Sequence, residues 1–134
     1  MRRLLLVTLL FCFASGLGQA AGKKAAPPPV QRYVVFFQEW SAALDQAAQA
    51  VITQAADYAK TNPQHFVHVA GFADPTGSQK ANTLLADLRM QVVIDQLRAD
   101  GVPAAHIIGR GHGAVPPALS SQESRRVEIS FGTR

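Results

Sequence analysis

Apolar residues recur along this chain with two different periods, and together these periods predict strands alternating with helices. Residues 33–37 form a run of β-branched and aromatic side chains, which predicts a short buried strand. A second run at 66–70 predicts another strand, with Val67 and Val69 on the same face. Residues 126–131 alternate apolar and polar side chains, which is typical of a half-buried strand.

Between the first two strands, apolar residues at spacings of three and four predict a helix. The apolar stripe runs from Leu44 to Ala59. We expect Ser41 to cap the N-terminus of this helix, and Asn62 with Pro63 to end it.

A second helix is predicted before Gly101, and a third strand after it. The apolar face of this helix comprises Met90, Val93, Ile94 and Leu97. Residues 106–108 predict a strand, which we expect to run into a chain-reversing loop over the glycine-rich residues 109–113. The order is therefore βαβαββ, which predicts an α+β fold, a two-layer α/β sandwich with both helices on one face of a small sheet.

Length and composition favour one folded domain. The 134 residues are 48% hydrophobic, which is enough for a sizeable core. The formal net charge is +4, but Arg2 and Arg3 lie in the N-terminal segment and 9 acidic residues are interspersed with the other basic ones. Because no continuous basic face results, nucleic acid is not the expected partner.

The N-terminus predicts a secretory signal peptide over residues 1–21. Arg2 and Arg3 precede an apolar run, and small residues follow it at the expected cleavage position. An uncleaved anchor helix over residues 4–17 is the alternative interpretation. Residues 22–32 contain three consecutive prolines and predict a semi-rigid tether. The folded domain is thus expected over residues 33–134.

Cys12 is the single cysteine, and it lies within the predicted signal. It is either a residue of the signal core or a lipid attachment site, although Phe11 is bulky for the position before such a site. Without other cysteines, the folded part is expected to contain neither a disulfide nor a thiolate metal site.

Motifs of common enzyme classes are absent from the sequence. It contains no GxSxG elbow, phosphate-binding loop or HExxH pair, so we expect no catalysis and no cofactor. The four histidines are not at ligand spacing on one element, so no metal site is predicted.

One turn carries a more informative pattern. Residues 71–78 read GFADPTGS, followed by Asn82, Leu85 and Arg89. This resembles the G-x-x-D-x-x-G-S turn and N-x-x-L-x-x-x-R helix of the OmpA-like C-terminal domain family. The resemblance extends over about a hundred residues and includes the G-x-G at 111–113 and RRVEI at 125–129.

The resemblance implies non-covalent binding of the peptidoglycan stem peptide at diaminopimelate. The family's aspartate and arginine correspond to Asp74 and Arg89, and Asn82 to a polar residue of the same pocket. A guanidinium offers paired donors to a carboxylate, and a carboxylate accepts from an ammonium. We expect the backbone N–H groups of Gly77 and Ser78 to add hydrogen bonds.

Each of the three side chains also has a structural interpretation. Asp74 is suited to bonding its own turn, and Asn82 to capping locally. Arg89 is equally compatible with solvent exposure or with an intramolecular partner, Asp87 or Glu128. Because a straight helix from Ser78 would carry Arg89 about 16 Å from its start, the resemblance implies a main helix that starts only at the position of residue 86.

The chain departs from the family pattern at several positions. Phe72 and Ala73 replace the usual His and Thr, which we expect to remove two polar groups from the pocket wall. Gln38 and Trp40 stand where carboxylates are frequent, and Trp40 is expected to pack at the edge of the first strand. Arg125 is expected to be a structural or rim charge.

The predicted function is a peptidoglycan-binding module that anchors an envelope component or the outer membrane to the cell wall. The expected location is the periplasm of a Gram-negative bacterium. The alternative is a module that binds another envelope protein and has a degraded wall-binding site.

Overall fold

The computed structural model describes residues 30–114 and 121–134. The predicted signal peptide, Cys12 and most of the predicted tether lie outside these residues and remain predictions. No helix within the described ranges is both long and apolar enough to cross a membrane.

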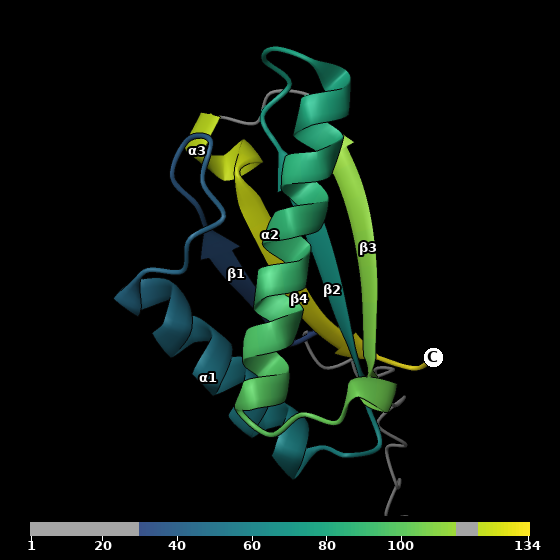
Figure 1. The fold of residues 1–134 in the computed structure, drawn as a ribbon. Helices are drawn as coiled ribbons and strands as arrows, with labels where there is room; N and C mark the ends of the chain where they lie inside the picture. The colour runs from purple at the N-terminus through teal and green to yellow at the C-terminus, as the bar shows by residue number, and fades with distance from the viewer. Residues whose placement is uncertain (1–29, 115–120) are drawn as a thin grey trace, which may run out of the picture.

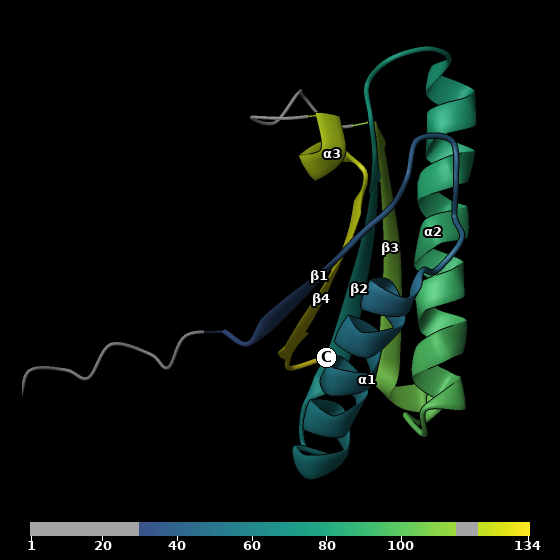
Figure 2. The ribbon, with the colours of Figure 1, turned by 90° about the vertical axis from the view of Figure 1, so that its left-hand side faces the viewer.

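The described residues form two layers, a four-stranded sheet and two long helices that cover one of its faces (Figures 1 and 2). The elements in chain order are β1 (Arg32–Phe36), α1 (Gln46–Thr61), β2 (Phe66–Ala73), α2 (Gln79–Ala99), a 3-10 turn (Ala104–His106), β3 (Ile107–Ala114), α3 (Ser121–Ser124) and β4 (Arg126–Gly132). The predicted α+β class and the βαβαββ order of the main elements are confirmed.

The strand order across the sheet is β1-β4-β2-β3. β4 lies between β1 and β2 and is antiparallel to both, whereas β2 and β3 are parallel. The parallel pair requires a crossover, and α2 provides it. The end of β2 and the start of β4 therefore lie at the same end of the sheet, next to the segment that leaves β1.

The core lies between the sheet and the two helices. Alternate residues of the strands point into it, as their period of two requires. The buried face of α1 consists mainly of alanines. The fully or almost fully buried members include Val35, Ile52, Ala55, Val67, Val69, Val93, Leu97, Val127 and Ile129.

The prediction that Ser41 caps α1 is wrong. The helix begins four residues later, where the Asp45 carboxylate accepts a hydrogen bond of 2.7 Å from the N–H of Ala48. The Ser41 hydroxyl instead accepts from the N–H of Ala43 within the preceding turn. Asn62 ends the helix, as predicted.

The start of the second helix also differs from the expectation. α2 runs without interruption for 21 residues from its N-cap Ser78, so the expected start at Ala86 is wrong. The loop after β2 extends beyond the end of the sheet, and the helix then doubles back along it (Figure 2). Arg89 therefore comes close to the end of β2 although it lies in the third turn of a straight helix.

The glycine-rich residues 109–113 belong to β3, and the predicted chain-reversing loop is wrong. Glycine is needed here because α2 packs closely on the strand. A Cβ added at Gly109 would lie 2.8 Å from Cδ1 of Ile94, and one added at Gly111 would collide with the Asp87 side chain.

Candidate functional site

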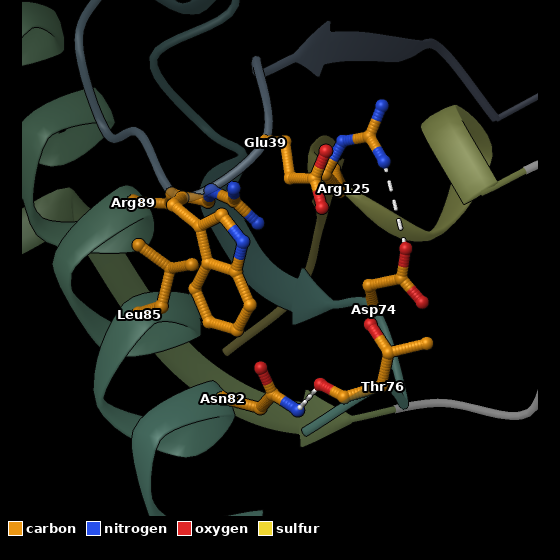
Figure 3. A pocket seen from close by; sticks show the side chains of 8 residues that line it. Glu39, Asp74, Thr76, Asn82, Leu85, Arg89 and Arg125 are labelled. Carbon is orange, nitrogen blue, oxygen red and sulfur yellow. Dashed lines mark hydrogen bonds and ion pairs between the residues drawn. The ribbon is translucent and has the colours of Figure 1, made fainter. Parts of the chain in front are cut away.

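A pocket lies where the segment after β1, the loop after β2 and the N-terminal half of α2 meet (Figure 3). It encloses about 230 Å³, including its open mouth. Its lining residues are Glu39, Trp40, Asp74, Thr76, Asn82, Leu85, Arg89 and Arg125. The structure thus brings Asp74, Asn82 and Arg89 to one cavity.

Arg89 is fully buried, with 0% of its surface exposed. Its Nε donates to the Ser41 carbonyl at 2.8 Å, and its Nη2 donates to the Gln38 carbonyl at 2.9 Å. The remaining nitrogen, Nη1, is buried and has no hydrogen-bond partner among the described residues. Arg89 is therefore not a solvated arginine, and the described residues place neither Asp87 nor Glu128 in an ion pair with it.

The pKa of Arg89 is lowered to about 10, chiefly by burial and in addition by the neighbouring charge of Arg125, while Asp74 acts in the opposite direction. The guanidinium is therefore still protonated at neutral pH. It is a desolvated positive charge whose hydrogen bonds go to neutral carbonyls, and an anion beside Nη1 would stabilise it.

Asp74 directly follows β2, and its side chain is 20% exposed. Its Oδ2 lies 3.5 Å from Nη1 of Arg125, a long contact that leaves acceptor capacity on the carboxylate. Arg125 precedes β4, and its Nε donates to the Phe37 carbonyl at 3.3 Å. Arg125 lines the pocket beside Asp74 (Figure 3), and its contacts with Phe37 and Asp74 agree with the structural part of the expectation.

Asn82 is not a helix cap, because Ser78 caps α2 and Asn82 lies inside this helix, and its role in ligand binding remains a prediction. It is 2% exposed and lines the pocket, while its Nδ2 donates to the Thr76 carbonyl at 2.7 Å (Figure 3). The bond joins the first turn of α2 to the loop that follows Asp74. Asn82 therefore fixes the shape of this loop from inside the cavity.

Gly77 and Ser78 are not among the lining residues. Ser78 is the N-cap of α2, and its hydroxyl accepts from the N–H of Ala81 at 3.4 Å. Gly77 has a φ of 87°, a left-handed conformation that favours glycine in this turn. Both residues shape the loop, and their role in ligand binding remains a prediction.

Phe72 and Ala73 do not line the pocket either, so their expected effect on its wall is wrong. Ala73 is buried in the core. Phe72 stacks on the His112 ring with centroids 4.8 Å apart, and Cζ of Arg126 lies 4.2 Å from the Phe72 centroid. The loss of polar groups at these positions leaves the pocket charges unchanged.

Sequence reasoning missed Glu39 and misplaced Trp40. Trp40 is 61% exposed and lines the pocket, so the expectation that it packs at the edge of the first strand is wrong. The only signal in the sequence that Trp40 lies near the site was its position in a segment where the family pattern has carboxylates. Within the described ranges, His, Cys, Asp and Glu form no group of three or more that is suited to hold a metal ion.

Comparison with known proteins identifies a matching family and several relatives of this chain. The model of the OmpA family matches residues 36–129. The peptidoglycan-binding protein ArfA of Mycobacterium tuberculosis is 33% identical over 118 residues, which cover 84% of this chain and 36% of that protein. The peptidoglycan-associated lipoprotein of Legionella pneumophila is 30% identical over 132 residues, which cover 88% of this chain and 74% of that protein.

A solved structure is similar over most of the domain. The peptidoglycan-associated lipoprotein from Burkholderia pseudomallei has a TM-score of 0.70 and 25% identity, covering 75% of this chain and 90% of that one. The chain spans only about a third of the length of ArfA, so these similarities concern a domain.

Proposed function

The chain belongs to the OmpA family, and from this premise we propose that it binds peptidoglycan non-covalently at a diaminopimelate residue of the stem peptide. Two relatives are named for peptidoglycan binding or association, which supports this choice of ligand. In this proposal the domain anchors an envelope component or the outer membrane to the cell wall, in the periplasm of a Gram-negative bacterium.

The unpaired Nη1 of Arg89 carries the proposal. A buried guanidinium nitrogen without a partner among the described residues is costly unless a ligand completes its hydrogen bonds. Nη1 belongs to a side chain that lines the pocket, and a carboxylate is the group that best matches it in charge and geometry. We therefore assign the ligand carboxylate to Arg89.

The other charges of the pocket match the second half of a zwitterion. Asp74 retains acceptor capacity beside its long contact with Arg125, and Glu39 adds another carboxylate to the lining. An ammonium group is the complementary ligand for these acceptors. Two acidic and two basic side chains line the cavity, so it suits an amino acid better than a simple anion.

The proposed activity is binding without bond cleavage. The described lining supplies charges and hydrogen bonds, and its one hydroxyl, that of Thr76, forms no hydrogen bond with a carboxylate among the described residues that would activate it as a nucleophile. Specific binding of a wall component also accounts for a buried arginine better than a role in stability alone, because buried ionic groups are weak evidence for stability.

Retention of the purified protein on isolated sacculi tests this proposal. Asp74→Ala and Arg89→Ala each remove a charge-assisted hydrogen bond and are expected to weaken retention about tenfold or more. Asp57→Ala and Arg98→Ala remove the same charges from exposed positions outside the pocket and should have no effect. Undiminished retention of both pocket variants would contradict the proposal.

A further inference from the structure

Trp40 has an unusual backbone conformation for a residue of its type. Its φ is 52°, and it is the only described residue other than glycine with a positive φ. Large side chains rarely adopt this left-handed region, and such strain persists only where the surrounding structure enforces it. The indole nevertheless remains 61% exposed, so burial of its surface does not explain the conformation.

The Arg89 guanidinium enforces this conformation. Its two bonded nitrogens hold the carbonyls of Gln38 and Ser41, which flank Trp40 on either side. The N–H of Ser41 also donates to the Gln38 carbonyl at 3.2 Å, which closes the turn. The same buried arginine therefore faces the pocket and fixes the backbone that carries Trp40.

The conformation places the indole on the pocket wall. Its Cη2 would lie 3.3 Å from a Cβ added at Gly77, so the ring also rests against the loop after β2. Leu85 is the other apolar lining residue, and it projects from α2 beside Arg89 (Figure 3). The pocket thus has an apolar part next to its charged part, which consists of Glu39, Asp74, Arg89 and Arg125.

We propose that Trp40 is a specificity-determining residue of this pocket. Its indole, together with Leu85, contacts the methylene chain that follows the zwitterionic head group of the ligand. The pocket therefore selects an amino acid with a long aliphatic side chain over a short one. This inference rests on the proposed function, because it assigns the head group to Arg89 and Asp74.

The test compares two free amino acids as probes of the purified full chain, glycine and meso-diaminopimelate, with affinities from NMR titration. Trp40→Gly removes the apolar contact but suits a positive φ. It is expected to weaken diaminopimelate binding about tenfold and glycine binding less than about twofold. Its thermal midpoint should equal or exceed that of the wild type. Trp40→Phe should restore most of the selectivity, and Leu84→Ala, at an exposed leucine outside the pocket, serves as the control.

Fluorescence gives a second readout, because Trp40 is the only tryptophan in the chain. Diaminopimelate should change its emission, and glycine should change it less. Equal weakening of both probes by Trp40→Gly, no weakening of either, or a loss of binding that follows a lower thermal midpoint would overturn this inference. If the wild-type protein also fails to bind sacculi, the proposed function itself is refuted. If the wild-type protein is retained on sacculi and one of these three results is found, only the role of Trp40 is refuted.

Discussion

Replacement of Arg89 by methionine separates binding from stability. Methionine fills a similar buried volume and is unbranched, so it is accommodated in the core with little strain. The substitution removes the two hydrogen bonds to the Gln38 and Ser41 carbonyls and the unpaired Nη1. It also removes a buried charge.

The expected change in stability is small because two large contributions oppose each other. Hydrogen bonds to a charged group contribute about 1.5–3 kcal/mol each, so their loss destabilises the fold by about 3–6 kcal/mol. Burial of a guanidinium costs several kcal/mol, and methionine lacks this cost. The same burial is the main cause of the lowered pKa of Arg89. We expect the free energy of unfolding to fall by at most about 3 kcal/mol.

Arg89→Met should weaken binding to sacculi much more strongly than it lowers stability. The ligand carboxylate loses the guanidinium to which it is assigned, so retention on sacculi should fall about tenfold or more. Urea unfolding followed by circular dichroism gives the stability, and sacculus retention gives the affinity. Arg98→Met, at an exposed position of the same helix, is the matched control and should change neither quantity. Full retention by a folded Arg89→Met protein would show that this guanidinium does not bind the ligand.

Three further predictions concern the framework of the site. Gly71→Ala places a Cβ against the backbone of α2 and should lower the free energy of unfolding by at least about 2 kcal/mol in urea titrations. Gly132→Ala, whose Cβ would make only an ordinary contact of 3.8 Å with the His68 ring, should change it by less than about 0.5 kcal/mol. Asn82→Ala leaves a loop carbonyl without its donor and should cost about 1–2 kcal/mol, and exchange of loop amides with deuterium should become faster. Asp45→Ala should cost about 1 kcal/mol in thermal unfolding, more than Ser41→Ala, and the reverse order would contradict the observed N-cap.

The order of strands and helices was predictable because each element buries one face, and a buried face leaves a period in the sequence. Val127 and Ile129 illustrate this, since both alternate with polar residues and both are fully buried. The strand at 109–113 was not predictable in the same way. Glycine there reflects the close approach of α2, which is a tertiary contact, and the local sequence equally favours a turn.

The site was predictable in its charges but not in its geometry. Asp74 and Arg89 were identified through a family pattern, and the fold brings both to one pocket. The burial of Arg89 has no local signature, because its carbonyl partners lie 48 and 51 residues away in the chain. The same long-range bonds set the conformation of Trp40, so its place in the pocket was equally hidden.

The central claim is that the unpaired nitrogen of a buried arginine receives the ligand carboxylate. A crystal structure of the protein with meso-diaminopimelate tests it most directly. We expect a carboxylate of the amino acid within hydrogen-bond distance of Nη1 of Arg89, with the adjacent ammonium at Asp74. A ligand bound at another surface, or in this pocket with Nη1 still unpaired, would contradict it.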